Sequence, residues 1–68
     1  MRNYAFIKGH YKTLFTALPD GGYYITQYQF LPGHLNWIPY SGKKVSEEEA
    51  AAVMKRLAKQ QYSLVKGA

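Results

Sequence analysis

The sequence predicts a small α+β domain in which a three-stranded antiparallel sheet, or a four-stranded one, packs in two layers on a single C-terminal helix. Three observations predict this β-β-β-α order. The stretch 23–31 alternates with a period of two, as a strand does. The residues Pro19-Asp20-Gly21-Gly22 before it form a hairpin turn signal, and Ser46 begins a long run of helix-forming residues.

The length of 68 residues allows one domain, because a chain of this size buries only about 60% of the surface that its unfolded form exposes. We predict a single domain over 1–68, with the sheet at about 3–39, a loop at 40–45 and the helix at about 46–64. The sequence has no cysteine, so no disulfide supports the core. No stretch has the ~20 apolar residues that cross a bilayer. We therefore expect a cytoplasmic protein.

The first two strands are predicted from β-favouring runs on either side of Gly9. In the run 3–8, Tyr4 and Phe6 fall on one face, and the run 12–18 is rich in Thr, Leu and Phe, which suit a pleated surface. Gly9-His10 interrupts this pattern and separates the two strands. Alternatively, the two runs form one long bent strand with Gly9 at a bulge.

The stretch Tyr23–Trp37 is predicted to hold the central strand of the sheet. Asp20-Gly21 before it tolerates the positive φ of a hairpin turn, so this strand should pair antiparallel with the run 12–18. One of its faces carries Tyr24, Thr26, Tyr28 and Phe30, and the other carries Tyr23, Ile25, Gln27, Gln29 and Leu31. Both faces are partly apolar, so the pattern leaves open which of them the helix covers.

The end of the sheet is predicted from a second turn signal, Pro32-Gly33. The residues 35–38 then form a short strand. Pro39 cannot donate to a ladder, so it ends this strand early or places it at an edge of the sheet. The residues 40–45 follow as a loop.

The helix is predicted from its start. Ser46 with Glu49 three residues later is a capping box, and three glutamates occupy the first turn, where the helix dipole favours negative charge. An apolar stripe at helical spacing consists of Ala50, Val53, Met54, Leu57, Gln61 and Leu64. The opposite arc carries Lys55, Arg56, Lys59 and Lys66, and we interpret this arc as a solvated face.

Catalytic groups are scarce in this sequence. His10 and His34 both lie in predicted turns, and the acids are Asp20 in a turn and Glu47–Glu49 at the helix start. A general base needs a partner that orients it, and these acids already have structural roles. Neither a metal-ligand spacing nor a glycine-rich phosphate loop is present. We therefore predict a protein that is not an enzyme and that uses no metal or cofactor.

The functional prediction rests on the basic charge of +5 and the seven tyrosines. One helix covers one face of a sheet, so aromatic residues remain on the other. We predict a small binding module whose first candidate partner is nucleic acid. Tyr24, Tyr28 and Trp37 would stack bases, and Lys8, Lys12, Lys43 and Lys44 would meet phosphates. Lysine in place of arginine favours contact with the backbone over the reading of bases.

Two alternatives use the same aromatic face. One is a small protein-binding inhibitor or adaptor, of the kind that phages and mobile elements direct against a host protein. The other is a homodimer. The position of the lysines discriminates between them: lysines around the aromatic face favour nucleic acid, and lysines elsewhere favour a protein or dimer interface.

Overall fold

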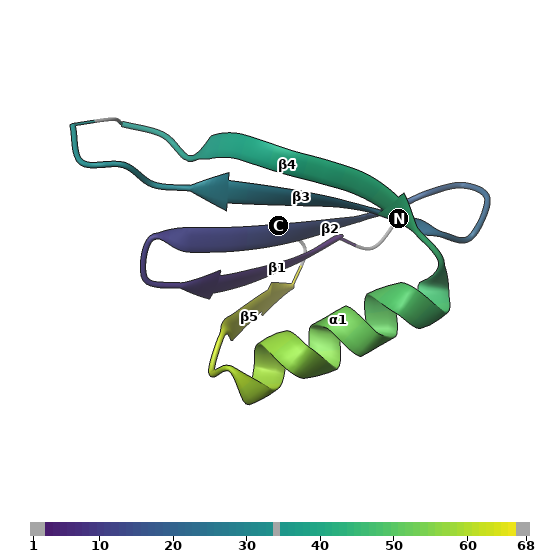
Figure 1. Cartoon of the computed structure of the whole chain (residues 1–68). Helices are drawn as coiled ribbons and strands as arrows, with labels where there is room; N and C mark the ends of the chain where they lie inside the picture. Colours follow the sequence, from purple (N-terminus) through teal and green to yellow (C-terminus); the bar gives the residue numbers. More distant parts are fainter. Residues whose placement is uncertain (1–2, 34, 67–68) are drawn as a thin grey trace.

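The computed structural model describes residues 3–33 and 35–66, which form one five-stranded antiparallel sheet and one helix (Figure 1). The elements are β1 (Asn3–Lys8), β2 (Tyr11–Ala17), β3 (Tyr23–Gln29), β4 (Ile38–Val45), α1 (Glu47–Lys59) and β5 (Ser63–Lys66). The strand order across the sheet is β4-β3-β2-β1-β5. The predicted α+β class and its two layers are confirmed, with five strands in place of three or four. The stretch predicted to hold the central strand forms β3, which lies beside the middle strand β2, because β5 adds a strand beyond β1.

The first three strands form a meander of two hairpins. Tyr4 of β1 lies opposite Phe15 of β2, so these runs are two strands and not one bent strand. Gly9 between them has a φ of 57°, in the left-handed region that glycine adopts without strain. The predicted turn between β2 and β3 is confirmed, because the Leu18 N–H donates to the Gly22 carbonyl at 2.8 Å and β3 pairs antiparallel with β2.

The strand β4 corrects the prediction for the end of the sheet. The predicted strand 35–38 and loop 40–45 are replaced by one strand, Ile38–Val45, and Leu35 is exposed outside it. Pro39 does not end the strand. It lies opposite Tyr28, beside a shift in register. Because β4 is an edge strand, as the proline indicated, half of its backbone groups need no partner in the sheet.

The helix begins as predicted and ends earlier. The Ser46 Oγ accepts a hydrogen bond from the Glu49 N–H at 3.1 Å, which caps the first turn. At the other end, the Gln61 N–H donates to the Ala58 carbonyl and the Tyr62 N–H donates to the Leu57 carbonyl, both at 3.1 Å. This pattern is a Schellman motif, which stops a helix.

The residues after this motif form β5, so the predicted helix over 46–64 is wrong beyond Lys59. Gln61 takes the left-handed position with a φ of 66°, where glycine is usual. Leu64, predicted on the helix stripe, lies in β5 opposite Phe6 of β1. The physical reason is that the free edge of β1 offers the chain a strand partner. Because residues 60–62 include no glycine or proline, the sequence carries no visible signal for the end of the helix.

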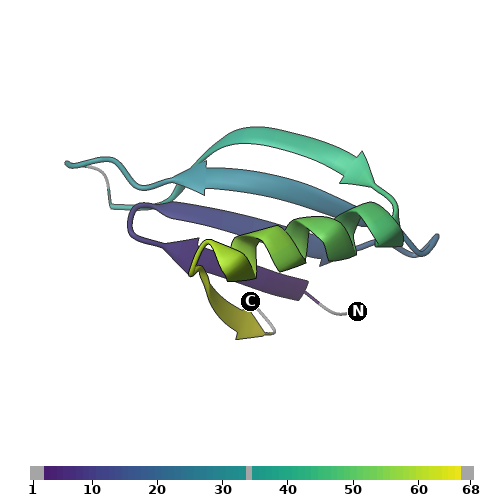
Figure 2. The same cartoon turned by 60° about the horizontal axis from the view of Figure 1, so that its bottom comes forward.

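The core lies between α1 and one face of the sheet (Figure 2). Its buried residues are Phe6, Phe15, Ile25, Val45, Ala50 and Leu57, and Tyr4, Tyr23, Val53, Met54 and Tyr62 pack around them. Phe15 is 0% exposed, and its ring meets that of Phe6 edge to face at 5.6 Å. Because Ile25 of β3 belongs to this core, the alternate residues of β3 face away from α1.

No helix within the described part of the chain is both long and apolar enough to cross a membrane, and α1 has 13 residues.

Candidate functional site

The side of the sheet away from α1, called here the open face, carries the aromatic row of β3. Strand alternation places Tyr24, Thr26 and Tyr28 on this side, because Ile25 points into the core. The register adds Lys12 of β2, which lies directly opposite Tyr28, and Lys44 of β4, which lies opposite Tyr24. The choice that the sequence left open is therefore settled in favour of an uncovered aromatic row.

One cation and three aromatic rings meet on this side near the end of β3, and we call them the Lys12 cluster: Lys12, Tyr28, Phe30 and Trp37. The Lys12 Nζ lies 4.6 Å from the centroid of the Tyr28 ring and 5.2 Å from that of Trp37. The Phe30 ring meets the Trp37 ring edge to face at 5.5 Å. Such cation–π contacts contribute about 0.5–1 kcal/mol each where they are exposed.

The structure brings together three of the residues predicted for the site, Lys12, Tyr28 and Trp37. Phe30 was not among the predicted site residues, although its place in the row with Tyr24 and Tyr28 was a signal for it. Tyr24 is on the same face, but its side chain lies over Gly42 of β4. A Cβ added to Gly42 would approach the Tyr24 hydroxyl oxygen to 2.7 Å.

The four predicted lysines divide between the two sides of the sheet. Lys12 and Lys44 lie on the open face, whereas strand alternation places Lys8 and Lys43 on the helix side. The Lys8 Nζ donates to the Gln60 carbonyl at 2.7 Å and lies 5.8 Å from the centroid of the Tyr62 ring. The lysines thus do not surround the open face, and Lys12 is the one at the centre of the aromatic contacts.

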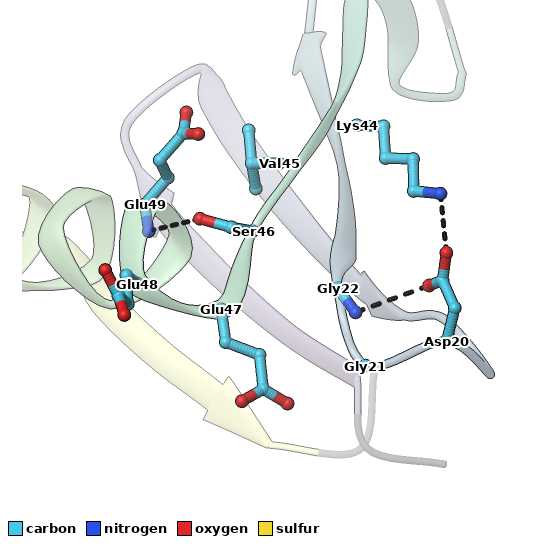
Figure 3. A pocket seen from close by; sticks show the side chains of 9 residues that line it. All are labelled: Asp20, Gly21, Gly22, Lys44, Val45, Ser46, Glu47, Glu48 and Glu49. Carbon is cyan, nitrogen blue, oxygen red and sulfur yellow. Dashed lines mark hydrogen bonds and ion pairs between the residues drawn. The ribbon is translucent and has the colours of Figure 1, made fainter.

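All four acidic residues of the chain lie together at the opposite end of the molecule. A hollow of about 740 Å³ between the β2–β3 turn and the start of α1 is lined by Asp20, Glu47, Glu48 and Glu49 (Figure 3). The Lys44 Nζ forms an ion pair with the Asp20 Oδ2 at 2.6 Å. The end of the sheet that holds the Lys12 cluster therefore carries no acidic side chain.

The ion pair also affects the acidity of Asp20. The hydrogen bond from Lys44, with a smaller contribution from the Gly22 N–H, holds the pKa of the Asp20 carboxyl below its ordinary value of 3.8. Asp20 therefore stays ionised, and it neutralises one of the two lysines on the open face.

The remaining charged and metal-ligating residues form no second centre. In the ranges 3–33 and 35–66, no three His, Cys, Asp or Glu side chains gather in a group that could hold a metal ion. His10 is exposed in the β1–β2 turn, and its ring lies 6.4 Å from that of Phe30. His34 lies outside the described residues. Lys55, Arg56 and Lys59 are exposed on α1, and Lys66, predicted on the same arc, belongs to β5.

A comparison of the chain with protein-family models, with curated proteins and with solved structures finds no match in any of the three.

Proposed function

We propose that the protein binds single-stranded nucleic acid on the open face, through the Lys12 cluster. One observation carries the proposal: the Lys12 ammonium lies within 5.2 Å of two ring centroids, at the end of the molecule away from all four acidic residues. Tyr28 and Trp37 would stack bases, and Lys12 would meet the phosphate that joins them.

The chemistry of a single strand fits this arrangement. An unpaired base offers its flat face to an aromatic ring, and each stacked base contributes about 1–3 kcal/mol. The phosphate beside it needs a cation close to the ring, and Lys12 is close to both the Tyr28 and the Trp37 rings. A lysine ammonium binds phosphate without the planar fork by which arginine reads guanine. Binding with little sequence preference is the consequence.

The charge distribution supports the same partner. The chain has a net charge of +5, yet its acids are confined to the hollow beside the β2–β3 turn. A polyanion that lies on the opposite end of the sheet meets Lys12 without repulsion from a nearby carboxylate. Tyr24 and Lys44 extend the same face toward the acidic end, where the Asp20 ion pair reduces the attraction.

The test uses the single tryptophan of the chain as a reporter. Thymidine and uridine oligomers of about 16 nucleotides, the upper site size of a small single-strand binding fold, are titrated into the protein. We expect the fluorescence of Trp37 to be quenched on stacking. We also expect the logarithm of the affinity to fall with the logarithm of salt concentration, with a slope of about −0.7 per phosphate contact.

Matched variants assign the contact. Lys12→Met keeps an unbranched side chain of nearly the same length and removes its charge, so the salt slope should become shallower by about 0.7, one phosphate contact. Lys43→Met removes a lysine from the helix side of the sheet and serves as the control. Tyr28→Leu should weaken binding about 5- to 150-fold, from the loss of one stacked base. Failure of both oligomers to bind at low salt would contradict the proposal.

A protein partner, or a second copy of this chain, is the alternative occupant of the open face. It is favoured by a specific observation: the lysines do not surround the open face, which is the arrangement that favours a protein or dimer interface. Lys8 and Lys43 lie on the helix side, and Lys44 is paired with Asp20. A protein anchor needs aromatic area more than charge. A concentration-dependent molar mass in light scattering, lost in Tyr28→Ala, together with no binding of either oligomer, would favour a homodimer.

A further inference from the structure

A second hollow lies at the same end of the sheet as the Lys12 cluster. It has a volume of about 740 Å³ and is formed where the β1–β2 turn, the residues after β3 and the end of α1 meet. These three segments lie at the same end of the molecule in Figure 1. The lining residues that its chemistry depends on are Lys8, Tyr11, Phe30 and Tyr62. We call it the helix-end hollow.

Aromatic rings and nitrogen groups supply its chemistry. Tyr11, Phe30 and Tyr62 line it with rings, and no acidic residue is among its lining. Tyr11 is 47% exposed, so much of its side chain is open to a ligand. A ligand with a flat apolar body and a negative charge matches such a lining, and a nucleotide has both features.

Lys8 supplies the cationic group of this hollow. Its ammonium is held by the Gln60 carbonyl at 2.7 Å, above the Tyr62 ring. A lysine ammonium has three donors, and this hydrogen bond uses one of them. The other two donors can bind a phosphate, and the Gln60 carbonyl at the end of α1 fixes the position of the ammonium.

Phe30 connects the two regions. The centroid of the Phe30 ring lies 5.5 Å from that of Trp37 in the Lys12 cluster, and Phe30 also lines the helix-end hollow. A nucleic-acid strand bound at the Lys12 cluster therefore reaches the hollow once it passes the Phe30 side chain.

We propose that the helix-end hollow binds one further nucleotide of the same single strand, with its base among Tyr11, Phe30 and Tyr62 and its phosphate on Lys8. This assignment rests on the proposed function. It makes the binding site continue around the end of the sheet from the open face to the end of α1. It also gives Lys8 a binding role beside its hydrogen bond to the Gln60 carbonyl.

The experiment compares two exposed tyrosines. Tyr11→Ala removes a ring of the hollow. Tyr40→Ala removes a ring that is 56% exposed and that belongs to neither the hollow nor the Lys12 cluster. Affinity for the labelled thymidine oligomer is measured by anisotropy, and Trp37 quenching reports the open face separately. We expect Tyr11→Ala to weaken binding about 5- to 150-fold with Trp37 still quenched at saturation, and Tyr40→Ala to leave the affinity unchanged.

A second pair of variants tests the phosphate contact. Lys8→Met should make the salt slope shallower by about 0.7, and the exposed helix variant Lys55→Met should leave it unchanged. Circular dichroism of all four variants checks that they are folded.

The possible results separate this proposal from the proposed function. Equal affinities for Tyr11→Ala and Tyr40→Ala, with Trp37 quenched, overturn the hollow and leave the open face as the site. Absence of oligomer binding to the unmodified protein overturns both. Thymidine monophosphate that binds as tightly as the oligomer, with amide shifts at Gly9 and Tyr62, overturns the strand assignment in favour of a free nucleotide.

Discussion

Asp20 accepts hydrogen bonds from two sides, from the Lys44 Nζ at 2.6 Å and from the Gly22 N–H at 3.4 Å. Both interactions favour the ionised carboxyl, so its pKa in the folded protein lies below 3.8. A depressed pKa stabilises the fold above the pKa of the unfolded chain, and this contribution is lost as the pH falls through the folded value. Both side chains are exposed, so solvent screens the pair and its effect on stability is small.

The pKa of Asp20 gives a test at the scale of a single residue. In Lys44→Met, we expect the pKa of Asp20 to rise toward 3.8, because the largest cause of its depression is removed. The measurement is an NMR titration of the Asp20 carboxyl carbon. Lys43→Met, one residue away on the other side of the sheet, should leave the pKa as it is. An unchanged pKa in Lys44→Met would show that the ion pair does not form in solution.

The sequence predicted the individual residues of the Lys12 cluster better than their assembly. Alternation along β3 predicted Tyr28, and charge suggested Lys12. The meeting of Lys12 with Trp37 depends on the path of the chain between β3 and β4, which no local pattern specifies. Lys8 and Lys43 were expected beside the aromatic residues because of their charge, but strand register assigns them to the helix side.

At the scale of an element, local sequence signals predicted one end of α1 and missed the other. Ser46 and the three glutamates give the N-terminus a recognisable signature, and the structure has its cap there. The C-terminus ends in a Schellman motif with Gln61, at a φ of 66°, where glycine is usual. The missing glycine explains why the predicted helix continued into β5.

One substitution at Gln61 should make the protein more stable. Gln61→Gly should raise the free energy of unfolding by about 1 kcal/mol, because a residue with a Cβ is strained in the left-handed region. Gln60→Gly is the matched control: Gln60 has an ordinary φ of −83°, so glycine there should lower stability by about 0.5–1 kcal/mol. Urea unfolding midpoints measure both. A loss of stability in Gln61→Gly would contradict the strain argument.

The strand β4 shows a different limit of sequence-based prediction. Its residues Tyr40–Lys44 include serine, glycine and two lysines, which are typical of loops. They form a strand because β3 presents a free edge beside them, and pairing with that edge compensates for their weak preference. Tertiary context of this kind is absent from a local pattern, whereas the hairpin of β2 and β3 is specified by its own turn residues.

The whole molecule depends on one small core. Phe15 is its largest fully buried side chain, at the middle of the sheet under α1. Removal of a buried phenylalanine ring costs about 3–5 kcal/mol. Domains have about 0.05–0.15 kcal/mol of stability per residue, so this loss is a large fraction of what a chain of this length has.

We therefore expect Phe15→Ala to be largely unfolded at room temperature or to melt far below the unmodified protein. Thermal unfolding followed by circular dichroism measures the difference. Leu64→Ala removes an apolar side chain that is 46% exposed in β5, and it should shift the melting temperature only slightly. Similar shifts in both variants would mean that the core is not centred on Phe15.

The pairing of β5 with β1 brings the two ends of the described chain side by side, and it covers an edge of the sheet. The strand β5 has four residues and one neighbour, and both Leu64 and Val65 are exposed, so little holds it in place. Local opening of β5 would uncover the backbone groups of β1 while the rest of the sheet stays intact. An uncovered strand edge is a template for another chain. By pairing with β1, the strand β5 leaves this side of the sheet with an edge of only four residues, and short edge strands are one way in which proteins limit edge-to-edge association.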